Sequence, residues 1–221
     1  MLVSTKKSFE IFHDYSIIQA HNLTLPKHAE QYLYIKRLID LVLALIGIIL
    51  TLPIIMFFAI LIKLESAGSP FYVQERVGKN GKHFHIVKLR SMRIDAEKDG
   101  ALWAQVNDPR ITRVGAFIRK THIDELPQLV SVLKGDMSLV GPRPERPMFV
   151  AQFNREISGF ANRLLVKPGM TGLAQVNGGY DISPKEKLQL DLEYIQNLTF
   201  SLELKIMLKT LKVIVTGEGA R

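Results

Sequence analysis

The sequence predicts a mostly helical α+β protein with one segment embedded in a membrane. Three observations predict this fold class: an apolar run over Leu41–Ile62, two strand-like stretches joined at Asn80-Gly81, and several amphipathic helix patterns in the second half of the chain. We expect a loosely structured N-terminal extension over residues 1–33 and a membrane segment over residues 34–65. Residues 66–221 are expected to form one domain that contains a small β-hairpin and amphipathic helices along the membrane interface.

The composition narrows the classes of partner. The 221 residues are 47% hydrophobic, which is enough for a core, and they contain no cysteine, which excludes a disulfide framework and a thiolate zinc site. The net charge of +8 indicates an anionic partner, such as nucleic acid, anionic lipid or a phosphorylated substrate. Because the sequence has no basic arm and no RNA-binding aromatic signature, the membrane segment favours lipid and phosphate over nucleic acid.

The apolar run over Leu41–Ile62 is long enough to cross a bilayer as a helix. Pro53 interrupts it, since proline removes one helical hydrogen bond, and Thr51 can supply a hydroxyl to the freed backbone. Three arrangements fit this pattern: a kinked spanning helix, a re-entrant helix-break-helix that enters and leaves on the same face, and a buried core helix. The length of the run makes the core helix the weakest of the three.

Charged residues flank both ends of the apolar run. Lys36, Arg37 and Asp40 precede it as an interfacial anchor, and we expect Arg37 and Asp40 to form an ion pair unless Asp40 is only a helix-end charge. The cations that follow the run are Lys63, Arg76, Lys79, Lys82, Lys88 and Arg90. The positive-inside rule places basic flanks on the cytoplasmic side of the membrane, and here both flanks are basic. This pattern therefore favours the re-entrant arrangement, in which both ends lie on the same side.

A β-hairpin is predicted immediately after the membrane segment. Phe71–Val77 and His83–Leu89 read as strands, and the Asn-Gly dipeptide between them is typical of a hairpin turn. His83 and His85 alternate with apolar residues and therefore share a face. Without a third ligand nearby, a solvated strand face explains them better than a metal pair.

Two adjacent carboxylates, Asp124 and Glu125, form the candidate reactive centre. Acids beside cations suit a site for metal-bound phosphate, but acids followed by a proline also suit a helix start. Apolar spacing predicts a helix from Asp124 through Leu133 that ends at Gly135. Downstream, Arg143 lies in a loop stiffened by two prolines.

The C-terminal third contains three helix patterns and a glycine-rich loop. The helices are expected over Pro147–Phe160, from Ser183-Pro184 to Asn197, and over Ser201–Thr216. The loop over Pro168–Gly179 allows tight backbone and close approach to a ligand. In the last helix one face carries Leu204, Leu208, Leu211 and Val215, and another carries Lys205, Lys209 and Lys212. Such a helix either lies on a membrane surface or packs on the core as an ordinary surface helix.

Three groups of residues together resemble the bacterial sugar transferases, which are monotopic phosphoglycosyl transferases. They are Lys36–Asp40 with the apolar segment broken at Pro53; Asp124–Leu129 with Lys134–Ser138 and Gly141–Pro144; and Pro168–Gly178. The resemblance covers residues 34–217 and leaves the N-terminal extension outside.

The resemblance implies transfer of a sugar 1-phosphate from a UDP-sugar to undecaprenyl phosphate, with release of UMP, as the first membrane step of polysaccharide or glycan assembly. It further implies a re-entrant membrane segment and a catalytic domain on the cytoplasmic face of the inner membrane. Asp124 matches the nucleophile that forms a covalent phosphosugar intermediate, and Glu125 matches its partner beside Mg²⁺, so both are expected at the metal. Arg119 and Arg143 match basic residues that hold substrate phosphate.

Two positions depart from the family pattern. Many relatives have Ser-Pro at the membrane break, where this chain has Leu52-Pro53, and many have arginine where this chain has Gly179. The sequence leaves open the sugar, the pathway and whether the chain forms a homo-oligomer. A basic, membrane-anchored scaffold without catalysis is the main alternative function, and a nucleic-acid binder is supported by net charge alone.

Overall fold

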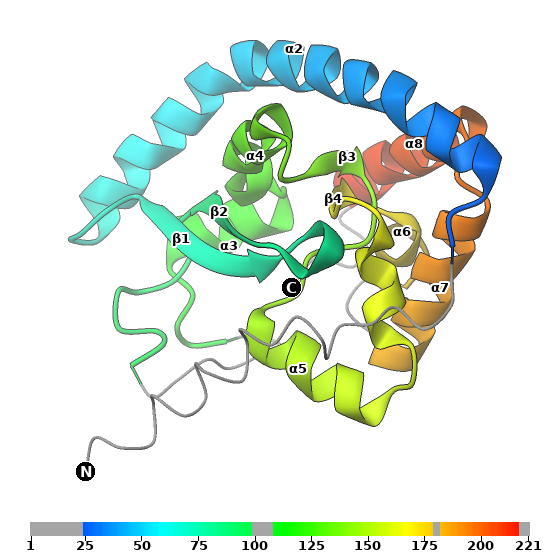
Figure 1. Cartoon of the computed structure of the whole chain (residues 1–221). Coiled ribbons are helices and arrows are strands. Elements are labelled where there is room, and N and C mark those ends of the chain that lie inside the picture. Colours follow the sequence, from blue (N-terminus) through cyan, green and yellow to red (C-terminus); the bar gives the residue numbers. More distant parts are fainter. Residues whose placement is uncertain (1–23, 99–107, 179–181, 217–221) are drawn as a thin grey trace.

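The computed structural model describes residues 24–98, 108–178 and 182–216. The elements are α2 (Lys27–Glu65), β1 (Phe71–Val77), η2 (Lys79–Gly81), β2 (His83–Leu89), α3 (Arg113–Lys120), η3 (Ile123–Gln128), α4 (Leu129–Lys134), β3 (Ser138–Val140), α5 (Pro147–Glu156), η4 (Phe160–Leu165), β4 (Gly169–Thr171), α6 (Leu173–Gly178), α7 (Pro184–Gln196) and α8 (Phe200–Thr216). The mostly helical α+β class is therefore confirmed. Figure 1 shows α2 arching over one side of the molecule, from the α7–α8 end to the β1–β2 end.

The helix α2 differs from the expected helix-break-helix in two ways. It begins at Lys27, so residues 27–33, expected to be loosely structured, form its first turns. It also continues through Pro53 as one helix of 39 residues. The Thr51 hydroxyl donates to the carbonyl of Gly47 at 2.7 Å, one turn back, and not to the Ile49 carbonyl that Pro53 leaves without its usual donor. A proline in a long helix bends it, and the arc in Figure 1 agrees with this milder outcome.

One stripe of α2 is buried and the rest is exposed. The buried residues are Ala29, Lys36, Asp40, Ala44, Ile55, Ala59 and Ile62. Of the most apolar 18-residue stretch of this helix, 17% is buried. Large apolar side chains such as Leu50 and Phe57 are 69% and 57% exposed. The buried-core-helix arrangement is therefore wrong, and α2 presents a long apolar surface that water does not favour.

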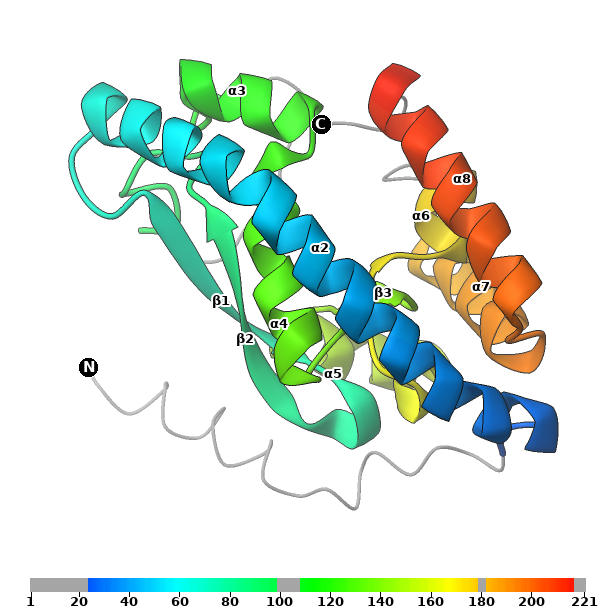
Figure 2. The ribbon, with the colours of Figure 1, turned by 90° about the horizontal axis from the view of Figure 1, so that it is seen from above.

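The C-terminal end of α2 is fixed to the domain by side-chain hydrogen bonds. Arg90, at the end of β2, donates to the carbonyl oxygens of Ser66 and Ala67 at 2.9 and 2.7 Å. Glu65 accepts from the backbone amides of Arg113 and Val114 and so caps the first turn of α3. Seen from above, α2 crosses the molecule with α4 and the β1–β2 hairpin on one side and with α3 and α8 on the other (Figure 2).

The predicted hairpin is confirmed over the expected residues. β1 and β2 pair antiparallel from Phe71↔Leu89 to Val77↔His83, and Asn80 at the turn has a positive φ of 55°. The short parallel pair β3–β4 and the helix α6 were not predicted. Each is three to six residues long, so neither shows a clear period in the sequence.

The two C-terminal helices follow their sequence signals. Ser183 and Glu186 form the predicted capping box at the start of α7. In α8, Glu203 and Ile206 are buried, whereas Leu204, Leu208 and Leu211 are 41%, 59% and 60% exposed. The helix α8 thus packs on the core through Ile206 and leaves its leucine face exposed, so its position at a membrane interface stays a prediction.

Candidate active site

Asp124 and Glu125 lie in the short helix η3. The turn before it contains His122 in the left-handed region (φ 56°), and α4 follows directly and ends at Gly135 with φ 90°. The predicted helix is thus a 3-10 turn followed by an α-helix, with the predicted end. Strand β2 packs along η3 and brings its own side chains to the two carboxylates.

Glu125 is held by two cations. Lys88 donates to Oε1 at 2.8 Å, and Arg143 bonds both carboxylate oxygens, with Nη1 at 3.1 Å from Oε2. Burial by itself raises the pKa of Glu125, but Arg143 and Lys88 outweigh burial and hold this pKa well below its ordinary value. Glu125 therefore stays ionised and fixes both cations beside Asp124.

Asp124 occupies a different electrostatic environment. It is 8% exposed, and burial, together with the negative charge of Glu125, raises its pKa from 3.8 to about 6. Lys88, Arg119 and Arg143 act in the opposite direction. The expected site residues Arg119 and Arg143 are thus both close enough to Asp124 to influence its charge. At neutral pH Asp124 is a carboxylate that is poorly solvated and surrounded by cations.

Lys88 was not singled out as a site residue from the sequence. The signal was present, however, because alternation in β2 places Lys88 on the same face as Phe84 and Ile86, which are 6% and 2% exposed. A lysine on the apolar face of a strand needs a charged partner, and here that partner is Glu125.

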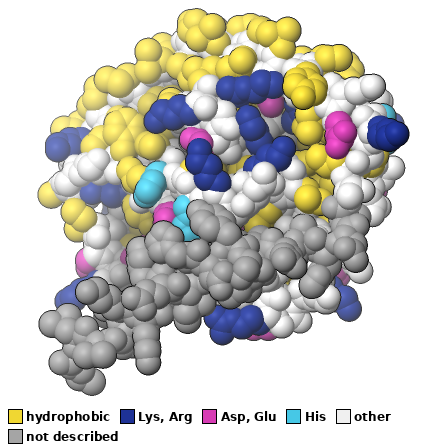
Figure 3. Space-filling model, in the orientation of Figure 1, with side chains coloured by type: hydrophobic (Ala, Val, Ile, Leu, Met, Phe, Trp, Pro, Cys, Tyr) yellow, Lys and Arg dark blue, Asp and Glu magenta, His cyan; other side chains and the backbone are white. Residues whose placement is uncertain are grey.

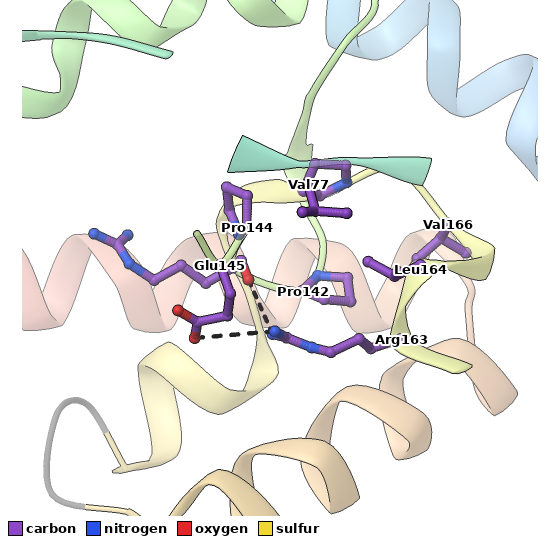
Figure 4. A pocket seen from close by; sticks show the side chains of 9 residues that line it. Val77, Pro142, Pro144, Glu145, Arg163, Leu164 and Val166 are labelled. Carbon is purple, nitrogen blue, oxygen red and sulfur yellow. Dashed lines mark hydrogen bonds and ion pairs between the residues drawn. The ribbon is translucent and has the colours of Figure 1, made fainter. Parts of the chain in front are cut away.

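A buried ion-pair network supports the loop that carries Arg143. Arg163 binds Asp191 with Nε at 2.8 Å and donates to the backbone carbonyl of Arg143 at 2.9 Å. Figure 4 shows Arg163 reaching toward Glu145, which also accepts from Lys187 at 3.2 Å. The backbone position of Arg143 is therefore fixed by charges of its neighbours as well as by proline.

The glycine-rich loop packs against the same Arg143 loop. A Cβ on Gly169 would lie 2.1 Å from the amide nitrogen of Gly141, and a Cβ on Gly172 would lie 2.2 Å from the Gly141 carbonyl oxygen. The expectation of tight backbone was right, since these glycines let the two loops approach each other; close approach of a ligand stays a prediction. Gly179 and the two residues after it lie outside the described residues.

The interfacial anchor residues connect α2 to the domain. Lys36 pairs with Glu203 of α8 at 2.6 Å and with Asp40 at 3.7 Å. Asp40 accepts from the hydroxyl of Ser138 and from the amide of Leu139. Arg37 donates to the carbonyls of Val132 and Leu133 at the end of α4. The expected Arg37–Asp40 ion pair is therefore wrong, because the partner of Asp40 is Lys36 one helical turn away.

The acid pair is the part of the described chain suited to a divalent metal. Among residues 24–98, 108–178 and 182–216 there is no cluster of three or more His, Cys, Asp or Glu side chains that could hold a metal. His83 contacts Glu75 at 2.9 Å and His85 is exposed, as expected for a solvated strand face. Asp124 and Glu125 fit Mg²⁺ that takes its other ligands from water and substrate phosphate, which is the usual arrangement for this ion.

Comparison with known proteins shows a clear family relationship. Residues 31–217 match the family model described as bacterial sugar transferase. A Bacillus subtilis protein, provisionally named an undecaprenyl-phosphate N-acetylgalactosaminyl 1-phosphate transferase, is 57% identical over 162 residues, which cover 73% of this chain and 90% of that protein.

Two further relatives carry related names. An Aeromonas hydrophila UDP-N-acetylgalactosamine-undecaprenyl-phosphate N-acetylgalactosaminephosphotransferase is 49% identical over 193 residues, covering 86% of this chain and 46% of that protein. A Caulobacter vibrioides UDP-glucose:undecaprenyl-phosphate glucose-1-phosphate transferase is 40% identical over 190 residues, covering 84% and 71%. The chain thus spans nearly all of one relative and about half of another.

Proposed function

Because the chain belongs to the bacterial sugar transferase family, we propose that it transfers a sugar 1-phosphate from a UDP-sugar to undecaprenyl phosphate and releases UMP. The observation that carries this proposal is the environment of Asp124, a buried carboxylate beside Glu125 and surrounded by Lys88, Arg119 and Arg143. Such a set of cations is what a diphosphate needs before an anionic nucleophile can approach it.

The names of the two relatives with the highest identities quoted above point to the sugar. Both are named for N-acetylgalactosamine, whereas the Caulobacter relative, at 40% identity, is named for glucose. We therefore propose UDP-N-acetylgalactosamine as the first substrate to test. The reaction opens the assembly of a polysaccharide or glycan on its lipid carrier.

The first chemical step is an attack by a carboxylate oxygen of Asp124 on the phosphorus that bears the sugar. The new bond is an acyl phosphate, the phosphorus–oxygen bond to UMP breaks, and UMP leaves with that electron pair. Arg143 and Lys88, fixed by Glu125, lie where they can bind the diphosphate oxygens, and Arg119 adds a third positive charge. No proton has to be removed from Asp124 above about pH 6, where its carboxyl group is already ionised.

The carboxylates of Asp124 and Glu125 would hold a Mg²⁺ ion. When bound, this ion would neutralise negative charge on the diphosphate and make its phosphorus more electrophilic. Glu125 Oε2 accepts a hydrogen bond from Nη1 of Arg143, and a carboxylate oxygen has lone pairs for more than one partner. The two carboxylates could therefore bind the ion while Glu125 keeps its hydrogen bonds to Lys88 and Arg143.

The second step needs the lipid acceptor at the protein surface. A phosphate oxygen of undecaprenyl phosphate attacks the acyl phosphate, and the released electron pair restores the Asp124 carboxylate. The exposed apolar surfaces of α2 and α8 support contact between the protein and the membrane in which this lipid is dissolved. We propose that α2 is re-entrant and that the domain lies on the cytoplasmic face of the inner membrane, where the basic flanks of α2 are favoured.

Release of UMP from a panel of UDP-sugars, with undecaprenyl phosphate in detergent or nanodiscs, tests the function. We expect turnover with at least one sugar and loss of turnover in Asp124→Asn. Full turnover of that variant would exclude the proposed chemistry. Membrane binding without UMP release from any UDP-sugar would favour a scaffold protein.

The orientation is tested separately by labels at Met1 and Arg221. Re-entry predicts that both labels are accessible only from the cytoplasm. A periplasmic N-terminal label would show that α2 spans the bilayer.

A further inference from the structure

A second cationic cavity lies away from the acid pair. It has a volume of about 230 Å³. Its lining comes from the β1–β2 turn and the start of β2, from the two residues that follow α4, and from the segment just before β4. The lining residues are Gly78, Lys79, Asn80, Lys82, Phe84, Gly135, Asp136 and Lys167. A water molecule takes up about 30 Å³ of liquid, so the cavity has room for a phosphate group and a few further atoms.

The lining carries three ammonium groups against one carboxylate. Within the described part of the chain, Lys79, Lys82 and Lys167 have no ion-pair partner, and Asp136 is the single acid of the lining. Like charges that line one cavity repel one another, and an anion between them removes the repulsion. The cavity therefore has the charge of a binding site for a monoanion or dianion.

A fourth cation, the guanidinium group of Arg37, lies beside Lys167 at Gly135. Nη2 of Arg37 and Nζ of Lys167 lie 3.2 and 3.4 Å from the point where a Cβ on Gly135 would stand. Arg37 is fixed there by its hydrogen bonds to the end of α4. Burial, and then the charge of Arg37, lower the pKa of Lys167; Lys79 adds to this effect, and the carboxylates of Asp40 and Asp136 partly oppose it.

The surroundings of the cavity indicate where the anion comes from. Arg37 belongs to α2, on which Tyr34, Leu38 and Leu45 are 83%, 64% and 51% exposed. Figure 3 shows Lys and Arg side chains gathered directly below the apolar band of α2 and around the β1–β2 turn. A lipid with its chains against that band would bring its phosphate to the cations. The carboxylate of Asp136 would accept a hydrogen bond from a headgroup hydroxyl.

The cavity is separate from the proposed reaction centre. Phe84 lines the cavity and Lys88 contacts Glu125, and these residues are four apart along β2. At about 3.3 Å per residue they are about 13 Å apart. A phosphate in the cavity therefore does not lie beside Asp124.

We propose that this cavity binds the phosphate of a membrane glycerophospholipid, with the headgroup between Lys79, Lys82 and Lys167 and the acyl chains against α2. The ligand class is a phosphodiester anion that carries a hydroxylated headgroup. The site goes beyond the transfer reaction, since it holds a lipid that is not consumed and orients the domain against the bilayer.

Calorimetric titration of the detergent-solubilised full chain, without any UDP-sugar, tests this site. The probes are dihexanoyl-phosphatidylglycerol below its micelle concentration and, separately, inorganic phosphate. We expect the lipid to bind at least about tenfold more tightly than phosphate, and Lys82→Gln/Lys167→Gln to weaken lipid binding about tenfold or more, since each cation–phosphate contact is a charge-assisted bond. Lys79→Gln/Lys82→Gln, which changes the turn alone, should weaken it similarly.

The matched control is Lys98→Gln/Lys185→Gln, which removes two exposed lysines outside the cavity. It should bind the lipid like the unmodified chain. Equal weakening in the control, or no lipid binding at all, would overturn the site. Phosphate that binds as tightly as the lipid and is lost in the cavity variants would overturn the lipid assignment in favour of a free-phosphate site. None of these outcomes depends on transfer activity, so a failed UMP assay leaves this test intact.

Discussion

Replacing Asp124 by asparagine should abolish turnover and at the same time stabilise the fold. The pKa of Asp124 is raised from 3.8 to about 6 because burial and Glu125 disfavour its charged form. At about 1.4 kcal/mol per pH unit, ionising Asp124 in the folded state costs up to about 3 kcal/mol at neutral pH. Asparagine has a similar shape and no charge, so the variant avoids this cost. Active sites commonly carry such a penalty.

The sign of the effect depends on pH in a defined way. Between pH 3.8 and about 6 the folded chain binds a proton at Asp124 that the unfolded chain has released, so the stability of the wild-type chain falls as pH rises through this window. The gain from Asp124→Asn should therefore be absent below about pH 3.8, increase through the window and stay constant above about pH 6.

Chemical denaturation in detergent with EDTA, repeated from pH 4 to pH 8, measures this gain. Asp95→Asn is the control, because the Asp95 side chain is 57% exposed and its replacement should change stability by less than about 0.5 kcal/mol. An Asp124→Asn variant that is no more stable than wild type at pH 8, or equally more stable at every pH, would refute the assignment of Asp124 as a strained, charged carboxylate.

Three other changes should have definite effects. Asp191→Asn leaves the buried Arg163 without its main partner, so we expect the free energy of unfolding to fall by about 3 kcal/mol and the melting temperature by roughly 6–12 °C. Because Arg163 also bonds the Arg143 carbonyl, the KM for the UDP-sugar should rise. An unchanged melting curve would contradict the role of this pair. Leu208→Glu places a charge on the exposed apolar face of α8, and in nanodiscs should increase labelling of a cysteine introduced at Leu211 by a water-soluble reagent, whereas equal labelling would show that α8 does not contact lipid. Gly141→Ala puts a Cβ 2.5 Å from the Lys167 carbonyl, so loss of thermal stability by several degrees is expected, and a variant as stable as wild type would contradict the packing of the two loops.

The elements with a clear sequence period were predictable. The hairpin follows from alternation and Asn80-Gly81, and α7 follows from its capping box, since both signals are local. The parallel pair β3–β4 was missed because its pairing joins segments about thirty residues apart and each strand has three residues. The side-chain pattern of the sequence cannot indicate a pairing that is made by backbone hydrogen bonds alone.

The course of α2 shows where local rules fail. Pro53 predicts a break, yet the helix continues, since one lost hydrogen bond is a small cost for a helix of 39 residues fixed at several points by the domain. The Arg37–Asp40 ion pair was predicted wrongly for a similar reason. Arg37 and Asp40 are close in sequence, but tertiary partners, Glu203 for Lys36 and the α4 carbonyls for Arg37, decide which charges pair.

The candidate site was only partly accessible from sequence. Asp124, Glu125 and the Arg143 loop were singled out from the residues themselves, whereas Arg119 and the role of each residue came through the family resemblance; the structure brings their charges together. Lys88 was overlooked because its neighbours in sequence are strand residues, although its position on the apolar face of β2 was a usable signal.

The most direct test of the mechanism is a single-turnover experiment without lipid acceptor. The full chain is mixed with UDP-N-acetylgalactosamine and Mg²⁺, quenched, and examined for released UMP and for added mass on the peptide that contains Asp124. The proposed mechanism predicts UMP in an amount close to that of the enzyme and a phosphosugar on Asp124, with neither in Asp124→Asn. For a UDP-sugar that is turned over in the complete assay, UMP release that occurs only when undecaprenyl phosphate is present, with no adduct at Asp124, would contradict the covalent step.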